Sequence, residues 1–181
     1  MISLGVLADT HIPDRMNGLN PRIMAIFHQA GVDAILHAGD VCKRSVLDEL
    51  GSLAPVYAVR GNRDFVALRN LPLTQSLEFE GVNLTMAHGH GAFMPYMMDK
   101  AHLFWHGMDE GRYRGRMLRE FPKARVIIFG HTHLRANAWV DGRLLFNPGS
   151  ACCPHEKNLS PSIGLLHIHA WGEVRGEIID L

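Results

Sequence analysis

The sequence predicts a single α/β domain over residues 1–181, built as a four-layer α-β-β-α sandwich of two mixed sheets flanked by helices. Two observations lead to this prediction. Strand-like and helix-like segments alternate over residues 2–59, an order typical of a mostly parallel sheet with crossover helices. Hairpin patterns dominate the second half and add antiparallel strands. No internal repeat, low-complexity tract or linker divides the chain.

The first strand and helix follow from apolar patterning. Residues 2–8 form a compact, mostly apolar run that ends at Asp9, which is typical of a strand buried on both faces. Residues 21–30 carry apolar side chains at helical spacing, and Gly31 follows directly. Because glycine commonly ends helices, this segment is predicted to be one helix.

The next three elements continue the alternation. Residues 34–38 and 55–59 are short apolar runs and are predicted strands. Between them, Ser45 is predicted to cap a helix that runs to Leu50, with Asp48 as the acid of a capping box.

Hairpins follow in the second half, at residues 76–87, 138–146 and 163–179. The second has Asp141-Gly142 at its turn, which is a strong hairpin signal. Residues 125–129 are a further apolar run and a predicted strand.

Composition limits the classes of partner. The chain is 47% apolar and 20% charged, and its 18 basic and 18 acidic residues give no net charge. Nucleic acid is therefore not an expected partner, since such binding usually shows as a basic excess. No apolar run reaches the roughly 18 residues that span a bilayer, and no basic leader resembles a signal peptide. We therefore expect no membrane partner. The chain has three cysteines, Cys42, Cys152 and Cys153, and this odd number indicates no disulfide framework, so we expect a cytoplasmic protein.

Six short polar motifs carry the chemistry. In chain order they are Asp9-Thr10-His11, Gly39-Asp40, Gly61-Asn62-Arg63-Asp64, His88-Gly89-His90, Gly130-His131-Thr132-His133 and Asn147-Pro148-Gly149-Ser150. Loops at the carboxyl ends of strands converge on one edge of an open sheet, so we expect these motifs to meet there. They supply two aspartates, an asparagine and four histidines, a set of oxygen and imidazole ligands that suits two transition-metal ions. Asp9 and His11 are two residues apart, which in extended geometry would point both to one side.

The order of these motifs resembles the calcineurin-like metallophosphoesterase superfamily, and the short chain is most similar to its small prokaryotic phosphodiesterase branch. The resemblance covers the chain from Asp9 to Ser150 and implies the same four-layer sandwich. It implies a first metal held by Asp9, His11 and His133, a second held by Asn62, His88 and His131, and Asp40 as the bridge between them. The closing Asn147–Ser150 motif resembles the family's last loop, although a plain β-turn explains it nearly as well.

The resemblance implies a phosphoesterase, with a phosphodiesterase favoured over a monoesterase, that acts on a small phosphate ester. Two divalent ions roughly 4 Å apart lower the pKa of a bridging water and hold a phosphoryl group for in-line attack by hydroxide. Manganese is the favoured cofactor; iron, nickel, cobalt and zinc also suit mixed nitrogen and oxygen ligands.

We predict catalytic roles for five residues: Asp40, Asn62, Arg63, Asp64 and His90. Many branches of the family have a histidine after the Gly-Asn pair, where it helps to protonate the leaving group. Arg63 stands there instead and cannot donate a proton at working pH, although its planar fork suits a phosphate oxygen. Asp64 is expected to orient a metal-bound histidine or Arg63. His90 either lines the pocket or hydrogen-bonds beneath His88.

Two other functions stay open. One is a non-catalytic scaffold subunit, like the retromer subunit that resembles this family; such scaffolds commonly lack part of the ligand set, which is complete here. The other is a metal-dependent nuclease, which the neutral charge disfavours.

Four further features of the sequence lie outside the six motifs. Residues 92–108 are rich in methionine and aromatic side chains and indicate core packing, a homodimer surface or a lid over a nucleobase. His102 and His106 are predicted to lie on a solvated or pocket-lining helical face. Basic residues gather over 112–125, where a solvated helix face is favoured over contact with a polyanion. Cys152 and Cys153 are expected to be loop or buried thiols.

Overall fold

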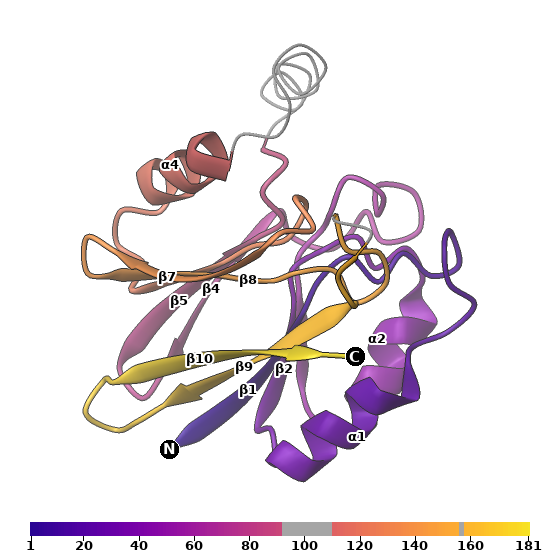
Figure 1. Cartoon of the computed structure of the whole chain (residues 1–181), viewed down its shortest axis with the longest axis horizontal. Helices are drawn as coiled ribbons and strands as arrows, with labels where there is room; N and C mark the ends of the chain where they lie inside the picture. Colours follow the sequence, from indigo (N-terminus) through magenta and orange to yellow (C-terminus); the bar gives the residue numbers. More distant parts are fainter. Residues whose placement is uncertain (92–109, 156–157) are drawn as a thin grey trace.

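The computed structural model describes residues 1–91, 110–155 and 158–181. Two five-stranded mixed sheets lie face to face, with helices on the outside (Figure 1). Helices α1 (Pro21–Ala30) and α2 (Arg44–Gly51) cover the outer face of one sheet, and α4 (Glu110–Glu120) lies over the outer face of the other. The predicted four-layer α-β-β-α sandwich is confirmed.

The first sheet has the strand order β10-β9-β1-β2-β3. Its members are β1 (Ile2–Leu7), β2 (Ala34–His37), β3 (Val56–Ala58), β9 (Ser162–Ile168) and β10 (Val174–Asp180). The first three run parallel, as the alternation of strands and helices predicts. The C-terminal hairpin extends this sheet, because β9 pairs antiparallel with β1.

The second sheet has the order β4-β5-β6-β8-β7. Its members are β4 (Thr74–Phe79), β5 (Val82–Ala87), β6 (Val126–Ile128), β7 (Arg135–Val140) and β8 (Arg143–Pro148). The three central strands run parallel, and the hairpin partners β4 and β7 form the edges. Both hairpins turn through two residues with positive φ, Glu80-Gly81 and Asp141-Gly142, which matches the twist of the flanking strands.

Helix α1 (Pro21–Ala30) begins and ends as expected. The Asn20 side chain accepts a hydrogen bond from the backbone amide of Arg22 at 3.0 Å. Gly31 ends the helix with φ of 58°, the left-handed conformation that glycine adopts at low cost. No helix among the described residues is both long and apolar enough to cross a membrane.

The predicted capping box of α2 (Arg44–Gly51) is wrong. The helix starts two residues earlier than predicted, with Lys43 at the cap position, so Ser45 lies inside the first turn. Lys43 makes no side-chain capping bond within the described residues. Asp48 instead pairs with Arg44 at 3.3 Å across one turn of the exposed face.

The main core fills the space between the sheets. It includes Leu4, Val6, Leu36, Met86, Ile128 and Phe146, all almost completely buried. Separate apolar clusters join α1 and α2 to the first sheet and α4 (Glu110–Glu120) to the second. Because both sheets pack on one core, the loops after their parallel strands are held together at one edge.

Candidate metal centre

The seven proposed ligands all follow strands of the two sheets. Asp9 and His11 follow β1, Asp40 follows β2, Asn62 follows β3, His88 follows β5, and His131 and His133 follow β6. Backbone hydrogen bonds join neighbouring loops: the Asp9 amide donates to Gly39, and the Gly130 amide donates to His88. Side chains from both sheets therefore meet at one site.

One group of ligand atoms centres on two histidines. Nε2 of His11 lies 3.2 Å from Nε2 of His133, and the latter lies 3.4 Å from Oδ1 of Asp9. Ligand atoms bound about 2.1 Å from one ion would lie about 3.0 to 3.4 Å from each other. The spacing of this group therefore suits a metal ion.

A second group centres on Asn62. Its Oδ1 lies 3.2 Å from Nε2 of His88 and 3.0 Å from Nδ1 of His131. Asp40 stands between the two groups: its Oδ1 is 3.5 Å from His88 Nε2, and its Oδ2 is 3.9 Å from His11 Nε2. Asp40 thus presents one oxygen to each group.

Backbone carbonyls orient two of the histidines. Nδ1 of His88 donates to the carbonyl of Ala38 at 2.7 Å, and Nδ1 of His133 donates to the carbonyl of Cys153. Each ring therefore turns an Nε2 lone pair toward the cluster, as in metal-binding histidines. Buried Oδ1 of Asp9 accepts no hydrogen bond from the described part of the chain. An orphaned carboxylate oxygen and inward lone pairs fit a bound cation.

The buried carboxylates also control the titration of the site. Burial by itself would lower the pKa of His88, but the charges of Asp40 and Asp9 raise it to about 9. Burial is likewise opposed at His133, where Asp9 raises the pKa. Burial and then the charge of His88 lower the pKa of His131 to about 3. The two carboxylates thus favour the protonated forms of His88 and His133, whereas burial favours the neutral form of His131.

The site backbone is held in an uncommon conformation. Asp9, His11, Asp40, His131 and His133 have positive φ values between 49° and 67°. Such values cost non-glycine residues on the order of 1 kcal/mol or more each, and they cluster at functional sites. The expectation that Asp9 and His11 share a side through extended geometry is therefore wrong, because both residues are left-handed.

Asp64 supports the backbone of the site. Its Oδ2 accepts hydrogen bonds from the amides of Asp40 (2.9 Å) and Gly61 (2.7 Å), and its Oδ1 accepts from the amide of Cys42 (2.7 Å). All three hydrogen bonds are to backbone amides. The prediction that Asp64 orients a metal-bound histidine or the Arg63 side chain is therefore not what these bonds show. Asp64 instead joins the loop after β2 to the loop after β3.

Two glycines permit close approach of these loops. A Cβ at Gly61 would lie 2.1 Å from Oδ1 of Asp40. A Cβ at Gly130 would lie 2.9 Å from Oδ2 of Asp9. Gly149 does not adjoin a proposed ligand, because a Cβ at this position would meet the side chain of Ser162 first.

Arg63 lies at the rim of the site. Its amide donates to Oδ1 of Asp40 at 2.8 Å, whereas its half-exposed guanidinium lies 3.4 Å from the carboxylate of Asp14. The next two residues, Phe65 and Val66, are strongly exposed. The loop therefore offers a cation beside an apolar surface.

His90 lines a cavity of about 160 Å³ together with His88. The two imidazole rings lie 5.4 Å apart. Burial and then the charge of His88 lower the pKa of His90 to about 4. Of the two interpretations from the sequence, the structure favours pocket lining.

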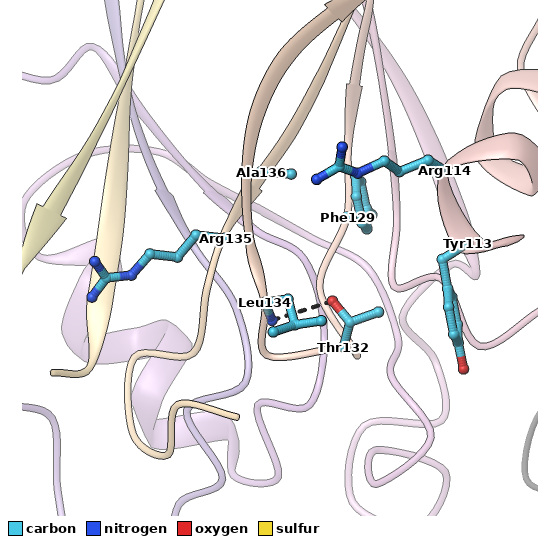
Figure 2. Close-up of a pocket in the computed structure, with 7 residues that line it drawn as sticks. All are labelled: Tyr113, Arg114, Phe129, Thr132, Leu134, Arg135 and Ala136. Carbon is cyan, nitrogen blue, oxygen red and sulfur yellow. Dashed lines mark hydrogen bonds between the residues drawn. The ribbon is translucent and has the colours of Figure 1, made fainter. Parts of the chain in front are cut away.

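Sequence reasoning missed Tyr113. Figure 2 shows this residue projecting from α4, and it lines a small cavity together with Thr132 of the loop after β6. Its ring lies 5.8 Å from that of His131. The basic residues over 112–125 were predicted to form a solvated helix face. Arg112 is exposed, as predicted, but the prediction is wrong for Arg116, which donates to the carbonyl of Gly89. A tyrosine amid arginines was the only signal.

The last motif closes the site from behind. The Ser150 hydroxyl donates to the carbonyl of Asp9 at 2.9 Å. The Asn147 side chain donates to the carbonyl of Gly130 at 3.1 Å. The motif thus does more than form a plain turn. The predictions for residues 92–108, which include His102 and His106, lie outside the described residues.

Known proteins are similar to this chain in sequence and fold. A probable metallophosphoesterase of Methanothermobacter thermautotrophicus is 33% identical over 165 residues, which cover 91% of this chain and 85% of that protein. A phosphodiesterase of Methanocaldococcus jannaschii is 26% identical over 91% of this chain and 92% of its own length. A solved archaeal phosphodiesterase aligns with a TM-score of 0.64 at 25% identity, covering 98% of this chain and 100% of that one.

The fold also matches Vps29 of Entamoeba histolytica, with a TM-score of 0.73, 24% identity and 99% coverage of both chains. Residues 2–170 match the family model described as the calcineurin-like phosphoesterase superfamily domain. The resemblance carried by the six motifs is therefore confirmed, and this chain belongs to the calcineurin-like phosphoesterase superfamily.

Proposed function

We propose that this protein is a phosphodiesterase that hydrolyses a small phosphate ester with two divalent metal ions. The observation that carries this proposal is the position of Asp40, whose two oxygens face two separate groups of nitrogen and oxygen ligands. A relative of similar length is named a phosphodiesterase. A cytoplasmic location is part of the proposal and is supported by three free cysteines.

In this proposal, one ion is held by Asp9, His11 and His133, the other by Asn62, His88 and His131, and Asp40 is shared. When bound, such ions activate water as a nucleophile and offset the charge of the phosphoryl group. Manganese is the favoured ion. Asn62 contributes oxygen without charge, which limits the negative charge around the second position. Asp64 and the carbonyl of Ala38 hold Asp40 and His88 in place.

Arg63 and its neighbours face the organic part of the substrate. Arginine keeps its proton at working pH, so Arg63 binds an anionic oxygen rather than protonating the leaving group. Esters with good leaving groups are therefore the favoured substrates. Exposed Phe65 and Val66 offer an apolar surface to the departing group.

Metal removal tests the proposal. Metal-stripped protein is expected to be inactive toward bis-p-nitrophenyl phosphate, and added Mn²⁺ should restore turnover. The diester should be hydrolysed faster than p-nitrophenyl phosphate under the same conditions. Faster monoester turnover would instead make the protein a monoesterase.

Arg63→Ala is expected to raise KM for bis-p-nitrophenyl phosphate about tenfold with little change in kcat, since a hydrogen bond to a charged group contributes about 1.5 kcal/mol. Arg63→Lys should fall between, because it keeps the charge but not the planar fork. Arg44→Ala is the matched control: Arg44 pairs with Asp48 on an exposed helix face. A lower kcat at unchanged KM would contradict a substrate-binding part for Arg63.

A scaffold is the second candidate, and the similarity to Vps29 folds favours it. A stoichiometric protein partner in a pull-down, together with no turnover in protein that binds two ions, would support this alternative. Turnover restored by Mn²⁺ would exclude a purely structural part.

A further inference from the structure

Two adjacent cysteines lie in the loop that follows β8. Sγ of Cys152 is 2.8 Å from Sγ of Cys153, and both thiols are free and only partly buried. Two thiols this close form a vicinal dithiol, which the proposed hydrolysis does not use.

The same loop supports the candidate metal centre. The carbonyl of Cys153 accepts the hydrogen bond from Nδ1 of His133. The amides of Cys152 and Cys153 donate to the hydroxyl of Ser150 at 3.2 Å and 2.8 Å, and that hydroxyl donates to the carbonyl of Asp9. Backbone movement at the cysteines would therefore reach His133 and Asp9.

We propose that Cys152 and Cys153 are a redox modification site that controls the orientation of His133. The oxidant is a low-molecular-weight disulfide such as oxidised glutathione. One cysteine attacks it, forms a mixed disulfide and releases one thiol. The second cysteine then attacks the first, the Cys152–Cys153 bond forms, and a second thiol leaves. Two protein thiols are thus oxidised while one disulfide is reduced to two thiols.

Either thiol can make the first attack, because both are free and only partly buried. The other sulfur lies 2.8 Å away and then resolves the mixed disulfide.

Such a bond must distort the loop. The Cα atoms of adjacent residues are about 3.8 Å apart, whereas disulfides usually join Cα atoms about 4.4 to 6.8 Å apart. The peptide between the cysteines therefore has to distort, and we expect the next carbonyl, that of Cys153, to shift away from His133. A strained disulfide is readily reduced, so the modification is reversible. The coupling to metal binding rests on the proposed metal centre, whereas the thiol chemistry does not.

Thiol counting and metal binding test the two steps separately. Metal-free protein is treated with oxidised glutathione, and free thiols and intact mass are measured. We expect the loss of two of the three thiols and of two hydrogens, without a glutathione adduct. Titration calorimetry with Mn²⁺ should then show affinity about 10- to 100-fold weaker than that of the reduced protein, which is the usual effect of losing a partner of a metal-binding histidine. Dithiothreitol should restore it.

Two variants distinguish oxidation of this dithiol from oxidation at other residues. Cys152→Ser should stop at a glutathione adduct and keep its Mn²⁺ affinity within about twofold, since the peptide stays unconstrained. Cys42→Ser retains the dithiol and should respond like the wild type. Disulfide formation with unchanged Mn²⁺ affinity, or three intact thiols after treatment, would overturn the inference. Reduced protein that binds no Mn²⁺ would overturn the metal centre and the coupling to His133, while the thiol count still decides whether the disulfide forms.

Discussion

Asp40→Asn is expected to reduce phosphodiesterase turnover by roughly 10³-fold, comparable to removal of a main electrostatic group of an active site. Asp40 presents one carboxylate oxygen to each ligand group. Asparagine has nearly the same shape but no charge, so it holds two cations poorly. Initial rates on bis-p-nitrophenyl phosphate, with calorimetric counting of bound Mn²⁺, measure the effect.

The fold should persist in Asp40→Asn. An asparagine oxygen can still accept the amide of Arg63, which now donates to Asp40 at 2.8 Å. His88 loses one of the two carboxylates that raise its pKa. Asp48→Asn, on the exposed face of α2, is the matched control and should keep full activity. Near-normal turnover in Asp40→Asn would exclude the proposed centre.

Asp64→Ala is expected to lower the free energy of unfolding by about 3 to 5 kcal/mol, because each buried donor left unpaired costs about 1 to 3 kcal/mol. Its carboxylate serves three backbone amides and is completely buried. For a chain of this length, that loss lowers the melting temperature by roughly 10 °C. Urea and thermal unfolding followed by circular dichroism measure both quantities.

Asp33→Ala provides the comparison for Asp64→Ala. The Asp33 carboxylate accepts one backbone amide, from Ser3, at the opposite end of β1 and β2 from the motifs. Its removal should cost only about 1 kcal/mol, the usual contribution of a single hydrogen bond. Asp64→Asn should lie between the two, because its amide keeps one acceptor oxygen but turns a donor toward a donor. Equal losses for Asp33→Ala and Asp64→Ala would show that Asp64 does not hold the loops.

Strand positions were predictable because the signal for them is local. Apolar runs such as residues 2–8 and 34–38 became β1 and β2 with small changes at their ends. Asp141-Gly142 formed the predicted turn because both residues adopt positive φ at modest cost. The start of α2 was not predictable in this way. Ser45 has the chemistry of a cap, but the helix extends beyond it to Arg44.

The sequence alone determined which strands and turns form and which side chains stand after them, since hydrophobic period and turn chemistry depend on near neighbours. The order of the six motifs also indicated the family to which the chain belongs. Only the tertiary structure decided how these side chains meet. His11 and His133 are 122 positions apart, yet their Nε2 atoms lie 3.2 Å apart. The positive φ values at Asp9, His11 and Asp40 were likewise not predicted from the sequence. Long-range hydrogen bonds, such as those from Ser150 and to Asp64, offset that backbone cost.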